Sequence, residues 1–202
     1  GWYSLSSPVW ANFGKDRGLP VSCFGSHIAD NIESILFTQA EVGEMSKMGG
    51  GTSGYFGNLR GRGADITDNG KAPGAVHFMN LFQSVVDNIS QGSTRRGRFS
   101  PYLPIEHPDI MEFLEIGTEG ASIQDLTHAV TVTDEFMESM ISGDKKKRAA
   151  WAKVIQRRGE IGYPYIMFHD TMNKNTVDVY KDKGATINNS NLCSEIALHN
   201  SE

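Results

Sequence analysis

The sequence predicts an α/β fold with a largely parallel sheet. Short runs rich in β-branched and aromatic residues alternate along the chain with longer segments whose apolar residues recur every three or four positions. The first pattern is typical of buried strands and the second of helices that cover a sheet. Their alternation favours parallel strands joined by helices. The 202 residues contain no internal repeat and no low-complexity linker, so one domain, or half of one, is the simplest organisation.

The individual elements follow from local patterns. Five short apolar segments bounded by polar or turn-forming residues are predicted strands, at residues 19–24, 55–56, 102–105, 129–132 and 165–168. Five segments with helical periodicity are predicted helices, at residues 28–48, 75–89, 109–114, 134–142 and 148–158. Pro108 suits the first turn of the third helix, and Thr133 or Asp134 can cap the fourth. The stretch that leads to Cys193 is predicted to be a polar loop.

Charge and composition argue against several classes of protein. The net charge of -5 does not suit a general nucleic-acid binder. Basic residues gather at 95–98, among glycines and serines that suit a phosphate site, and at 145–148, where a solvated helix face is expected. Two cysteines do not make a disulfide framework. With no signal peptide or transmembrane pattern recognised, we expect a cytoplasmic setting with free thiols and no membrane partner.

The segment around Cys193 has the most distinctive chemistry. If it is extended, Asn191, Cys193 and Glu195 share one face, because side chains alternate along a strand. The trio lacks the ligand number of a metal site, and no metal is expected. A neighbouring carboxylate raises a thiol pKa, which suits one-electron chemistry better than nucleophilic attack. The alternatives are a structural cysteine at position 193 and a plain core cysteine at Cys23.

Two glycine-containing loops are candidate ligand sites. The run at 49–54 stops a helix and lets a backbone approach an anion closely, but no Gly-Lys-Ser/Thr follows, so it is not a P-loop. The loop at 90–97 combines glycines with two guanidinium groups, which suits phosphate or base contacts. A solvated surface loop is the alternative for this second segment.

The motif Ser-Asn-Leu-Cys-Ser-Glu-Ile at 190–196 resembles the finger loop of class I and class II ribonucleotide reductase large subunits. The resemblance covers nearly the whole chain in the same order. The other matching stretches are the first barrel strand at 21–24, the acid Asp30, the glycine-rich strand and first effector loop at 49–60, the second effector loop at 90–95, and the turn at 106–110. The sequence departs from the family pattern near Thr67 and at the doubled Arg95-Arg96.

The resemblance implies a particular α/β fold, the first half of the ten-stranded α/β barrel of ribonucleotide reductase, ending in the catalytic finger loop. Residues 1–202 would form a partial catalytic barrel domain, with the half-barrel at 1–180 and the finger loop at 181–202. The second redox cysteine, the radical-relay tyrosines and the C-terminal thiol pair of the family would lie outside it. The chain would be a fragment or one half of a split protein, and inactive when isolated.

The resemblance also implies roles for individual residues. Cys193 would carry a thiyl radical that abstracts the ribose 3′ hydrogen, Glu195 would be the general base, Asn191 would bind the substrate hydroxyls, and Cys23 would be a redox thiol. The substrate-binding residues would be Ser7, Ser22, Cys23, Gly51, Asn191, Cys193 and Glu195. The effector-binding residues would be Asp30, Arg60, Gln91 and Arg95.

The implied activity is that of a ribonucleoside-diphosphate reductase, which supplies deoxyribonucleotides for DNA synthesis. The chain itself would bind no cofactor. The radical would come from a di-metal β subunit or, alternatively, from adenosylcobalamin, and the effectors would be deoxyribonucleoside triphosphates and ATP. Expected partners are the remaining C-terminal part of the α subunit, the β subunit, thioredoxin or glutaredoxin, the ribonucleoside diphosphate, and a second copy that packs through helices 28–48 and 75–89.

Two other functions stay open at this point. One is another thiyl-radical enzyme with the same barrel, such as a relative of pyruvate formate-lyase, although paired or glycyl-flanked cysteines and a glycyl loop are not visible. The other is a nucleotide-binding half-barrel without catalysis, against which the intact Asn191, Cys193 and Glu195 argue.

Overall fold

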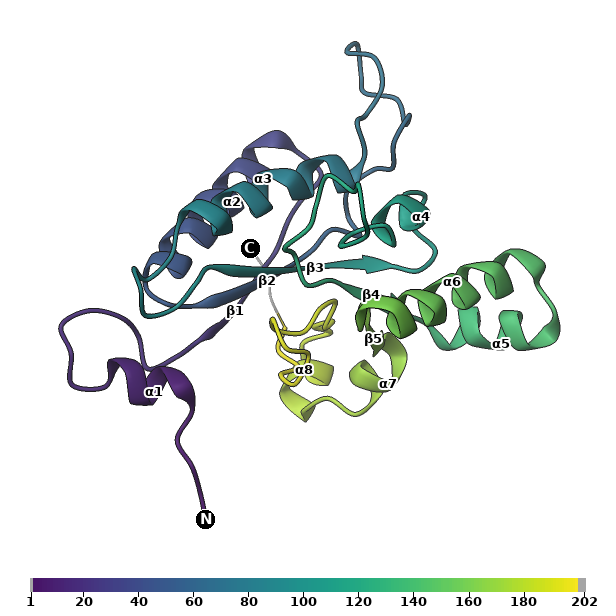
Figure 1. Cartoon of the computed structure of the whole chain (residues 1–202). Helices are drawn as coiled ribbons and strands as arrows, with labels where there is room; N and C mark the ends of the chain where they lie inside the picture. Colours follow the sequence, from purple (N-terminus) through teal and green to yellow (C-terminus); the bar gives the residue numbers. More distant parts are fainter. Residues whose placement is uncertain (1, 200–202) are drawn as a thin grey trace.

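The computed structural model describes residues 2–199 and is an α/β fold, as the sequence predicts. One five-stranded sheet lies at its centre (Figure 1). The strands are β1 (Cys23–Ser26), β2 (Gly51–Tyr55), β3 (Arg98–Pro104), β4 (Ala129–Val132) and β5 (Tyr165–Phe168). The helices are α1 (Ser7–Asn12), α2 (Ile32–Lys47), α3 (Ala75–Asn88), α4 (Ile110–Phe113), α5 (Asp134–Ser142), α6 (Lys145–Ile161), α7 (His169–Lys174) and α8 (Asp178–Asp182).

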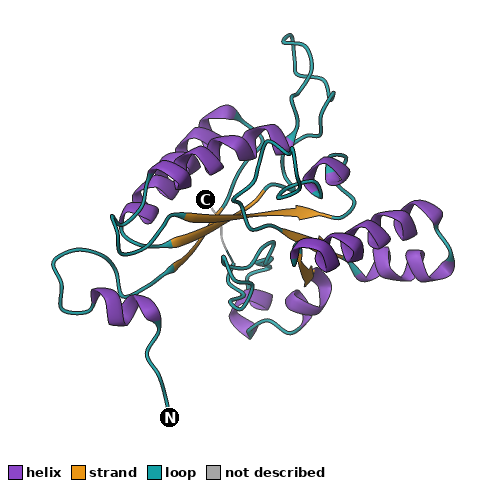
Figure 2. Ribbon diagram, in the orientation of Figure 1, coloured by secondary structure: helices purple, strands orange, loops and turns teal. Residues whose placement is uncertain are grey.

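All neighbouring strands are parallel and follow the chain order β1-β2-β3-β4-β5. Each strand must therefore return to the same end of the sheet through a long connection. Helices α2 and α3 make two of these returns and cover one face of the sheet, while α7, α8 and the C-terminal loop lie on the other (Figure 2). The C-terminal loop thereby lies against strands that are distant in the sequence, with 137 residues between Ser53 and Ser190 and 89 between Tyr102 and Asn191.

The two faces of the sheet have different side chains. In β3, Phe99 and Leu103 point into the main core under α2 and α3, where Phe99 stacks on Phe82 with ring centroids 4.7 Å apart. The intervening Tyr102 points to the opposite face, toward Ala129 and a smaller apolar cluster. The alternation follows from the two-residue repeat of a strand. One face is thus a packed core, and the other combines apolar with polar side chains.

Side-chain caps fix the starts of three helices. Asn31 accepts a hydrogen bond from the Ser34 amide at 2.7 Å and begins α2, four residues later than the sequence predicted. Thr133 accepts one from the Phe136 amide at 3.1 Å and begins α5, as expected. Asp144 accepts bonds from two amides at the start of α6. Each cap satisfies amide groups that have no partner within the helix.

Several predicted boundaries are wrong for identifiable reasons. The local pattern at 49–54 favoured a loop, but residues 51–55 form strand β2, with a parallel neighbour on each side, as the family resemblance implied. Strand β3 begins at Arg98 rather than at 102, since it pairs with the whole of β2. Helix α6 begins at Lys145, so the basic run forms its first turn. The expected C-terminal loop contains the short helices α7 and α8.

The basic run at the start of α6 is only partly solvated. The side chains of Lys145 and Lys146 lie in a turn that is exposed to solvent. Lys147, in contrast, forms an ion pair with Glu106 at 2.9 Å, and its ammonium group lies 5.5 Å from the centre of the Phe136 ring. The run therefore also ties α6 to the turn after β3. In the part of the chain described, no helix is both long and apolar enough to span a bilayer.

Candidate active site

The C-terminal loop is fastened to the open face of the sheet by short polar side chains. Ser53 of β2 donates a hydrogen bond from Oγ to the Ser190 carbonyl at 2.7 Å and accepts one from the Asn189 amide group at 3.3 Å. The Tyr102 hydroxyl of β3 donates to the Asn191 carbonyl at 2.9 Å and lies 2.8 Å from Ser194 Oγ. These contacts hold the loop at residues 189–194 across two strands.

Gly51 lets the loop approach the sheet closely. A Cβ atom at this position would lie 2.5 Å from Leu192 Cδ2, which is closer than carbon atoms pack. The glycine run was expected to admit an anion, and the group that the structure places over it is the Leu192 side chain. Because Gly51 has no side chain, the loop can pack directly on the sheet at this position.

The loop turns at the motif instead of running straight. The Asn191 side-chain oxygen accepts hydrogen bonds from the Glu195 and Ile196 amides, both at 3.0 Å, and Ser194 has a φ of 67°. The prediction of an extended segment is wrong, because an asparagine side chain competes with the backbone for these amides and favours a turn. Asn191 is buried at 6% exposure, whereas Cys193 and Glu195 reach solvent.

The turn brings the two cysteines of the chain into one site. The Asn191 Nδ2 group donates a hydrogen bond to Cys23 Sγ at 3.2 Å, and Ser22 Oγ lies 3.4 Å from the same sulfur. Cys23 is half-buried on β1 and Cys193 is exposed, and both are free thiols. The sequence could not show this proximity, since the two cysteines are joined only through the fold.

The electrostatics of the site keep the Cys193 thiol protonated. Its pKa is raised above the usual value, first because the sulfur is partly withdrawn from water and then because Glu195 and Cys23 oppose a negative charge. The Arg95 guanidinium acts in the opposite direction. The direction agrees with the sequence argument that a nearby carboxylate disfavours a thiolate. A neutral thiol suits hydrogen-atom transfer better than nucleophilic attack.

Tyrosines frame the site, and the sequence reasoning missed them. Tyr55, Tyr102 and Tyr165 occupy one row across the sheet, with Ala129 between the last two. Burial raises the pKa of Tyr102, and burial together with a hydrogen bond to Tyr163 raises the pKa of Tyr165 to about 12. Both hydroxyls therefore stay neutral donors. The two-residue repeat could have placed Tyr102 on this face, but no local signal identified its partner in the loop.

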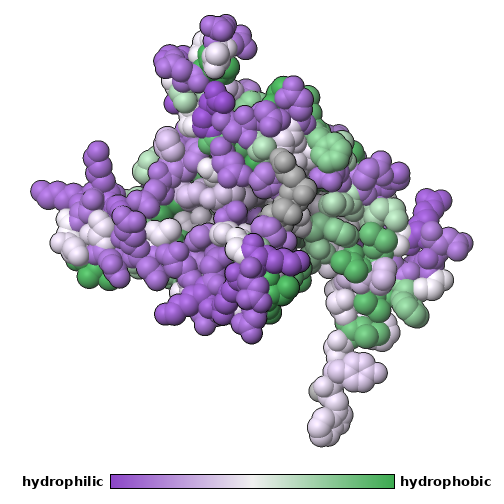
Figure 3. Space-filling view, turned by 180° about the vertical axis from the view of Figure 1, so that it is seen from behind, coloured by the Kyte–Doolittle hydropathy of each residue, from purple (hydrophilic) through white to green (hydrophobic). Residues whose placement is uncertain are grey.

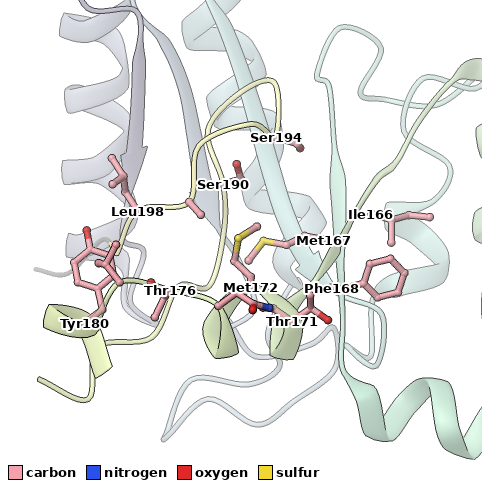
Figure 4. A pocket seen from close by; sticks show the side chains of 13 residues that line it. Ile166, Met167, Phe168, Thr171, Met172, Thr176, Tyr180, Ser190, Ser194 and Leu198 are labelled. Carbon is pink, nitrogen blue, oxygen red and sulfur yellow. The ribbon is translucent and has the colours of Figure 1, made fainter. Parts of the chain in front are cut away.

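A groove of about 520 Å³ opens beside the loop, between β5, α7 and α8. Figure 4 shows the sulfur atoms of Met167 and Met172 at its centre, with Ser190 and Ser194 on the loop above them. Its walls are mostly apolar. None of Asn191, Cys193 and Glu195 lines it. The groove adjoins the site without including the reactive groups.

Of the other predicted substrate residues, Ser22 and Gly51 lie beside Cys23, whereas Ser7 does not. Ser22 precedes Cys23 directly, and its carbonyl accepts a hydrogen bond from the Gly51 amide at 2.5 Å, so both belong to the site. Ser7 is the exposed first residue of α1, a helix that stands apart from the sheet in Figure 1. Within residues 2–199, no hydrogen bond connects its side chain to the loop or to β1.

Asp30 and Arg60 meet beyond the carboxyl ends of β1 and β2. Arg60 Nε lies 2.7 Å from an Asp30 carboxylate oxygen, and Arg60 Nη1 donates to the Asp65 carbonyl at 3.0 Å. The pair lines a pocket of about 420 Å³ whose other walls include Ile66 and Phe78. A guanidinium beside apolar walls suits a molecule with both an anionic and a planar part.

Gln91 and Arg95 lie at the opposite end of the sheet, in the loop before β3. The Gln91 amide donates to the Arg95 carbonyl at 3.0 Å, which closes the loop. The Gln91 side chain donates to Asn12 Oδ1 at 2.7 Å. The four predicted effector residues thus form two pairs, one at each end of the strands. Arg95 lies near enough to Cys193 to influence its charge.

No three or more His, Cys, Asp or Glu side chains within residues 2–199 are arranged to hold a metal ion.

The exposed apolar surface gathers on the side of the molecule that carries α1, β1 and α2 (Figure 3). On α2 this surface includes Ile32, Leu36 and Phe37, the last of which is 67% exposed.

Known proteins share both the sequence and the fold of this chain. The family model for the ribonucleotide reductase barrel domain matches residues 21–149 and 144–202. A putative ribonucleoside-diphosphate reductase large subunit of Frog virus 3 (isolate Goorha) is 32% identical over 217 residues, which span 98% of this chain and 37% of that protein. A vitamin B12-dependent ribonucleoside-diphosphate reductase of Thermoplasma acidophilum is 32% identical over 96% of this chain and 27% of that protein.

A solved structure gives the same result in three dimensions. The α subunit of the class Id ribonucleotide reductase of Actinobacillus ureae is 52% identical to this chain and superposes with a TM-score of 0.91, over 98% of this chain and 36% of that subunit. The chain therefore spans well under half the length of these relatives. The division into a half-barrel at 1–180 and a finger loop at 181–202 stays a prediction, and residues 1 and 200–202 lie outside the described part. The chain belongs to the ribonucleotide reductase large-subunit family and is part of its catalytic barrel.

Proposed function

We propose that the protein containing this chain reduces ribonucleoside diphosphates to deoxyribonucleotides by thiyl-radical chemistry. The observation that supports this most directly is the 3.2 Å hydrogen bond from Asn191 Nδ2 to Cys23 Sγ. It brings a redox thiol on the first strand to the turn that carries Cys193 and Glu195. A hydrogen-atom donor, a base, an amide and a second thiol are then available around one small substrate.

The steps follow from the properties of these groups. Cys193, oxidised to a thiyl radical by loss of one electron and its proton, takes the ribose 3′ hydrogen. Glu195 accepts the 3′-hydroxyl proton as general base and later returns it, while the 2′-hydroxyl takes a proton from Cys23 or its partner cysteine and leaves as water. Cys23, together with a second cysteine outside this chain, supplies two electrons and two hydrogens and becomes a disulfide, which thiol exchange resets. Cys193 finally returns the hydrogen to the 3′ carbon, so the radical is regenerated.

The substrate contacts are assigned by position. Asn191 lies between Cys23 and the turn, and its amide group would orient the substrate hydroxyls from there. Ser22 and Gly51 lie beside Cys23 at the start of β1 and β2, and they would line the substrate site next to this thiol. Ser7 would reach the diphosphate from α1. The elevated pKa of Cys193 supports the scheme, because a thiolate has no hydrogen atom to exchange with the sugar.

The radical comes from outside this chain. The class Id relative favours a separate radical-generating subunit, and relatives with vitamin B12-dependent names keep adenosylcobalamin as the alternative. When present, either group supplies the one-electron oxidation of Cys193. Thioredoxin or glutaredoxin would reduce the disulfide formed by Cys23, and a reducing compartment such as the cytoplasm would suit this step.

Nucleotide effectors would bind where Asp30 and Arg60 meet, with the guanidinium toward the phosphates. Gln91 and Arg95 lie at the other end of the sheet, so in one copy they do not complete that pocket. A homodimer through α2 and α3 would cover the exposed side chains of Ile32, Leu36 and Phe37 and provide a second set of loops. Effector and substrate sites would then be coupled through residues 90–97.

The decisive experiment uses the intact protein with its radical-generating partner. CDP labelled with tritium at the 3′ position reports hydrogen abstraction as well as product. Cys193→Ser is expected to abolish both deoxycytidine diphosphate formation and release of tritium. Cys23→Ser is expected to retain substrate binding and tritium release but to give no clean product. Turnover in Cys193→Ser would refute the radical role, and loss of substrate binding in Cys23→Ser would make Cys23 structural.

A further inference from the structure

A buried carboxylate outside the active site holds both ends of the segment that carries part of the nucleotide pocket. Asp109 follows Pro108 in the turn after β3, and its side chain is only 4% exposed. One oxygen accepts a hydrogen bond from the Arg62 amide and the other from the Ala75 amide, both at 2.8 Å. The two amides belong to residues that bracket the intervening hairpin.

The hairpin between these amides forms a wall of the pocket. Asp65 and Lys71 pair across it, and Ile66 and Asn69 near its tip line the pocket with Arg60. Gly74, the last residue before α3, has no side chain to cap that helix. Asp109 supplies the missing cap from another part of the chain, and its negative charge suits the amino end of a helix.

The turn that carries Asp109 is itself fixed from both sides. The Asp109 amide donates to His107 Nδ1 at 3.1 Å, and His107 Nε2 lies 2.8 Å from the Leu59 carbonyl. Both contacts are satisfied when His107 is neutral with its proton on Nε2. A Cβ atom at Gly61 would lie 2.6 Å from Pro108, so only glycine allows the hairpin to reach the turn this closely.

We propose that Asp109 is a positioning residue for nucleotide recognition. By holding the Arg62 and Ala75 amides it fixes the hairpin, and with it the direction from which Arg60 meets Asp30. The contacts of Arg60 with Asp30 and the Asp65 carbonyl then retain one geometry, ready for a triphosphate and its base. This inference rests on the effector site proposed above.

Two measurements on the intact protein test it. Asp109→Asn keeps the volume but can accept only one of the two amide hydrogens, so one of the Arg62 and Ala75 amides should exchange faster with solvent. Binding of dTTP, dATP, dGTP and ATP is measured by equilibrium dialysis. We expect the Kd of the tightest of these to rise about tenfold in Asp109→Asn and further in Asp109→Ala, as for loss of charge-assisted hydrogen bonds.

Glu112→Gln is the matched control. It removes the carboxylate that binds the Arg62 side chain at 2.7 Å but leaves the backbone amide contacts intact. Its nucleotide Kd should stay within about twofold of wild type, as for a solvent-exposed ion pair. Wild-type affinity in Asp109→Asn, or an equal loss in Glu112→Gln, would overturn the inference.

A different result is expected if the proposed effector site itself does not bind nucleotides. If the wild-type protein binds none of the four nucleotides, the proposed effector site is refuted and amide exchange alone decides the role of Asp109. Unchanged exchange at Arg62 and Ala75 in both Asp109 variants would then refute the positioning role as well. Faster exchange would leave Asp109 as the residue that holds the hairpin, without a nucleotide to position.

Discussion

The side-chain amide of Asn191 donates a hydrogen bond to Cys23 Sγ at 3.2 Å, across 168 residues of sequence. The oxygen of the same amide accepts two backbone hydrogens of the turn that carries Cys193. One side chain therefore both shapes the loop and connects it to the first strand. This dual role makes Asn191 the most informative position in the site.

Asn191→Asp should separate the two roles. Aspartate still accepts the Glu195 and Ile196 amides but no longer donates to Cys23, and its charge opposes a thiolate there. We expect the loop to remain folded and kcat to fall by about 100-fold or more, as for loss of a group that orients a substrate. Steady-state reduction of CDP measures the loss of turnover. The pH profile of Cys23 alkylation measures the effect of the new charge on the thiol.

Asn175→Asp is the control for this substitution. Among residues 2–199, its solvent-exposed side chain donates to the Thr171 carbonyl alone, at the end of α7. It should leave turnover and cysteine alkylation near wild type. A fully active Asn191→Asp protein would show that the contact with Cys23 is not required for reduction.

The raised pKa of Cys193 gives a prediction for pH dependence. A thiol with a raised pKa is protonated over a wider range of pH, so the alkylation rate should rise at a higher pH than for an unperturbed cysteine. Glu195→Gln removes one of the charges that oppose the thiolate, and the midpoint should move to lower pH. Iodoacetamide labelling is measured in a Cys23→Ser background and followed by mass spectrometry of the peptide that contains Cys193, so that other cysteines of the intact protein do not contribute.

The direction in which the pH midpoint of alkylation moves tests this electrostatic description. Arg95→Gln, which removes the opposing positive charge, should move the midpoint to higher pH in the same background. Two shifts of opposite sign would establish that both groups act on the thiol. A midpoint that is unmoved, or raised, in Glu195→Gln would contradict the electrostatic description of the site.

Tyr102→Phe should loosen the finger loop from the sheet. The substitution removes the hydroxyl that contacts the Asn191 carbonyl and Ser194 Oγ, and leaves the buried carbonyl without this partner. We expect a loss of about 1–3 kcal/mol in the free energy of unfolding and faster amide exchange at residues 190–195. Denaturant titration and exchange measurements check the two effects.

Tyr55→Phe is the comparison, because Tyr55 occupies the same row of the sheet. For its hydroxyl, the part of the chain described by the structure contains no hydrogen bond to the loop. Exchange at 190–195 should stay at the wild-type rate in this variant. Equal acceleration in both variants would mean that ring packing, and not the Tyr102 hydroxyl, holds the loop.

Much of the fold could be predicted from local patterns, and the site could not. Helix α3 and strand β4 have strong periodicity or β-branched composition, and their predicted limits agree with the structure to within a residue. The local pattern missed strand β2, which only the family resemblance indicated, because its glycines and serines have low intrinsic strand preference. These small residues leave room for the loop to pack closely on the strand. The contact between Cys23 and Asn191 joins residues 168 apart and requires the loop to lie across β2 and β3, so no local pattern could reveal it.

The closeness of Leu192 to β2 yields a prediction with an internal check. Gly51→Ala places a methyl group 2.5 Å from Leu192 Cδ2, so the leucine must rotate or the loop must move. Overpacking of this kind costs about 1–3 kcal/mol in the free energy of unfolding. Because Cys193 follows Leu192 directly, turnover should fall by about tenfold or more. Leu192→Ala removes the colliding carbons, and the double variant should be more stable than the sum of the single changes predicts.

A double-mutant cycle with Gly159→Ala as control makes the argument specific. Gly159 lies within α6, where an added Cβ meets no heavy atom within 4 Å, so alanine should stabilise the protein by about 0.5–1 kcal/mol. Its effect should add to that of Leu192→Ala, since the residues do not touch. The Gly51–Leu192 pair should instead show a coupling of about 1 kcal/mol or more. Additive effects at that pair would mean that the loop does not rest on Gly51, and the seat proposed for Cys193 would have to be abandoned.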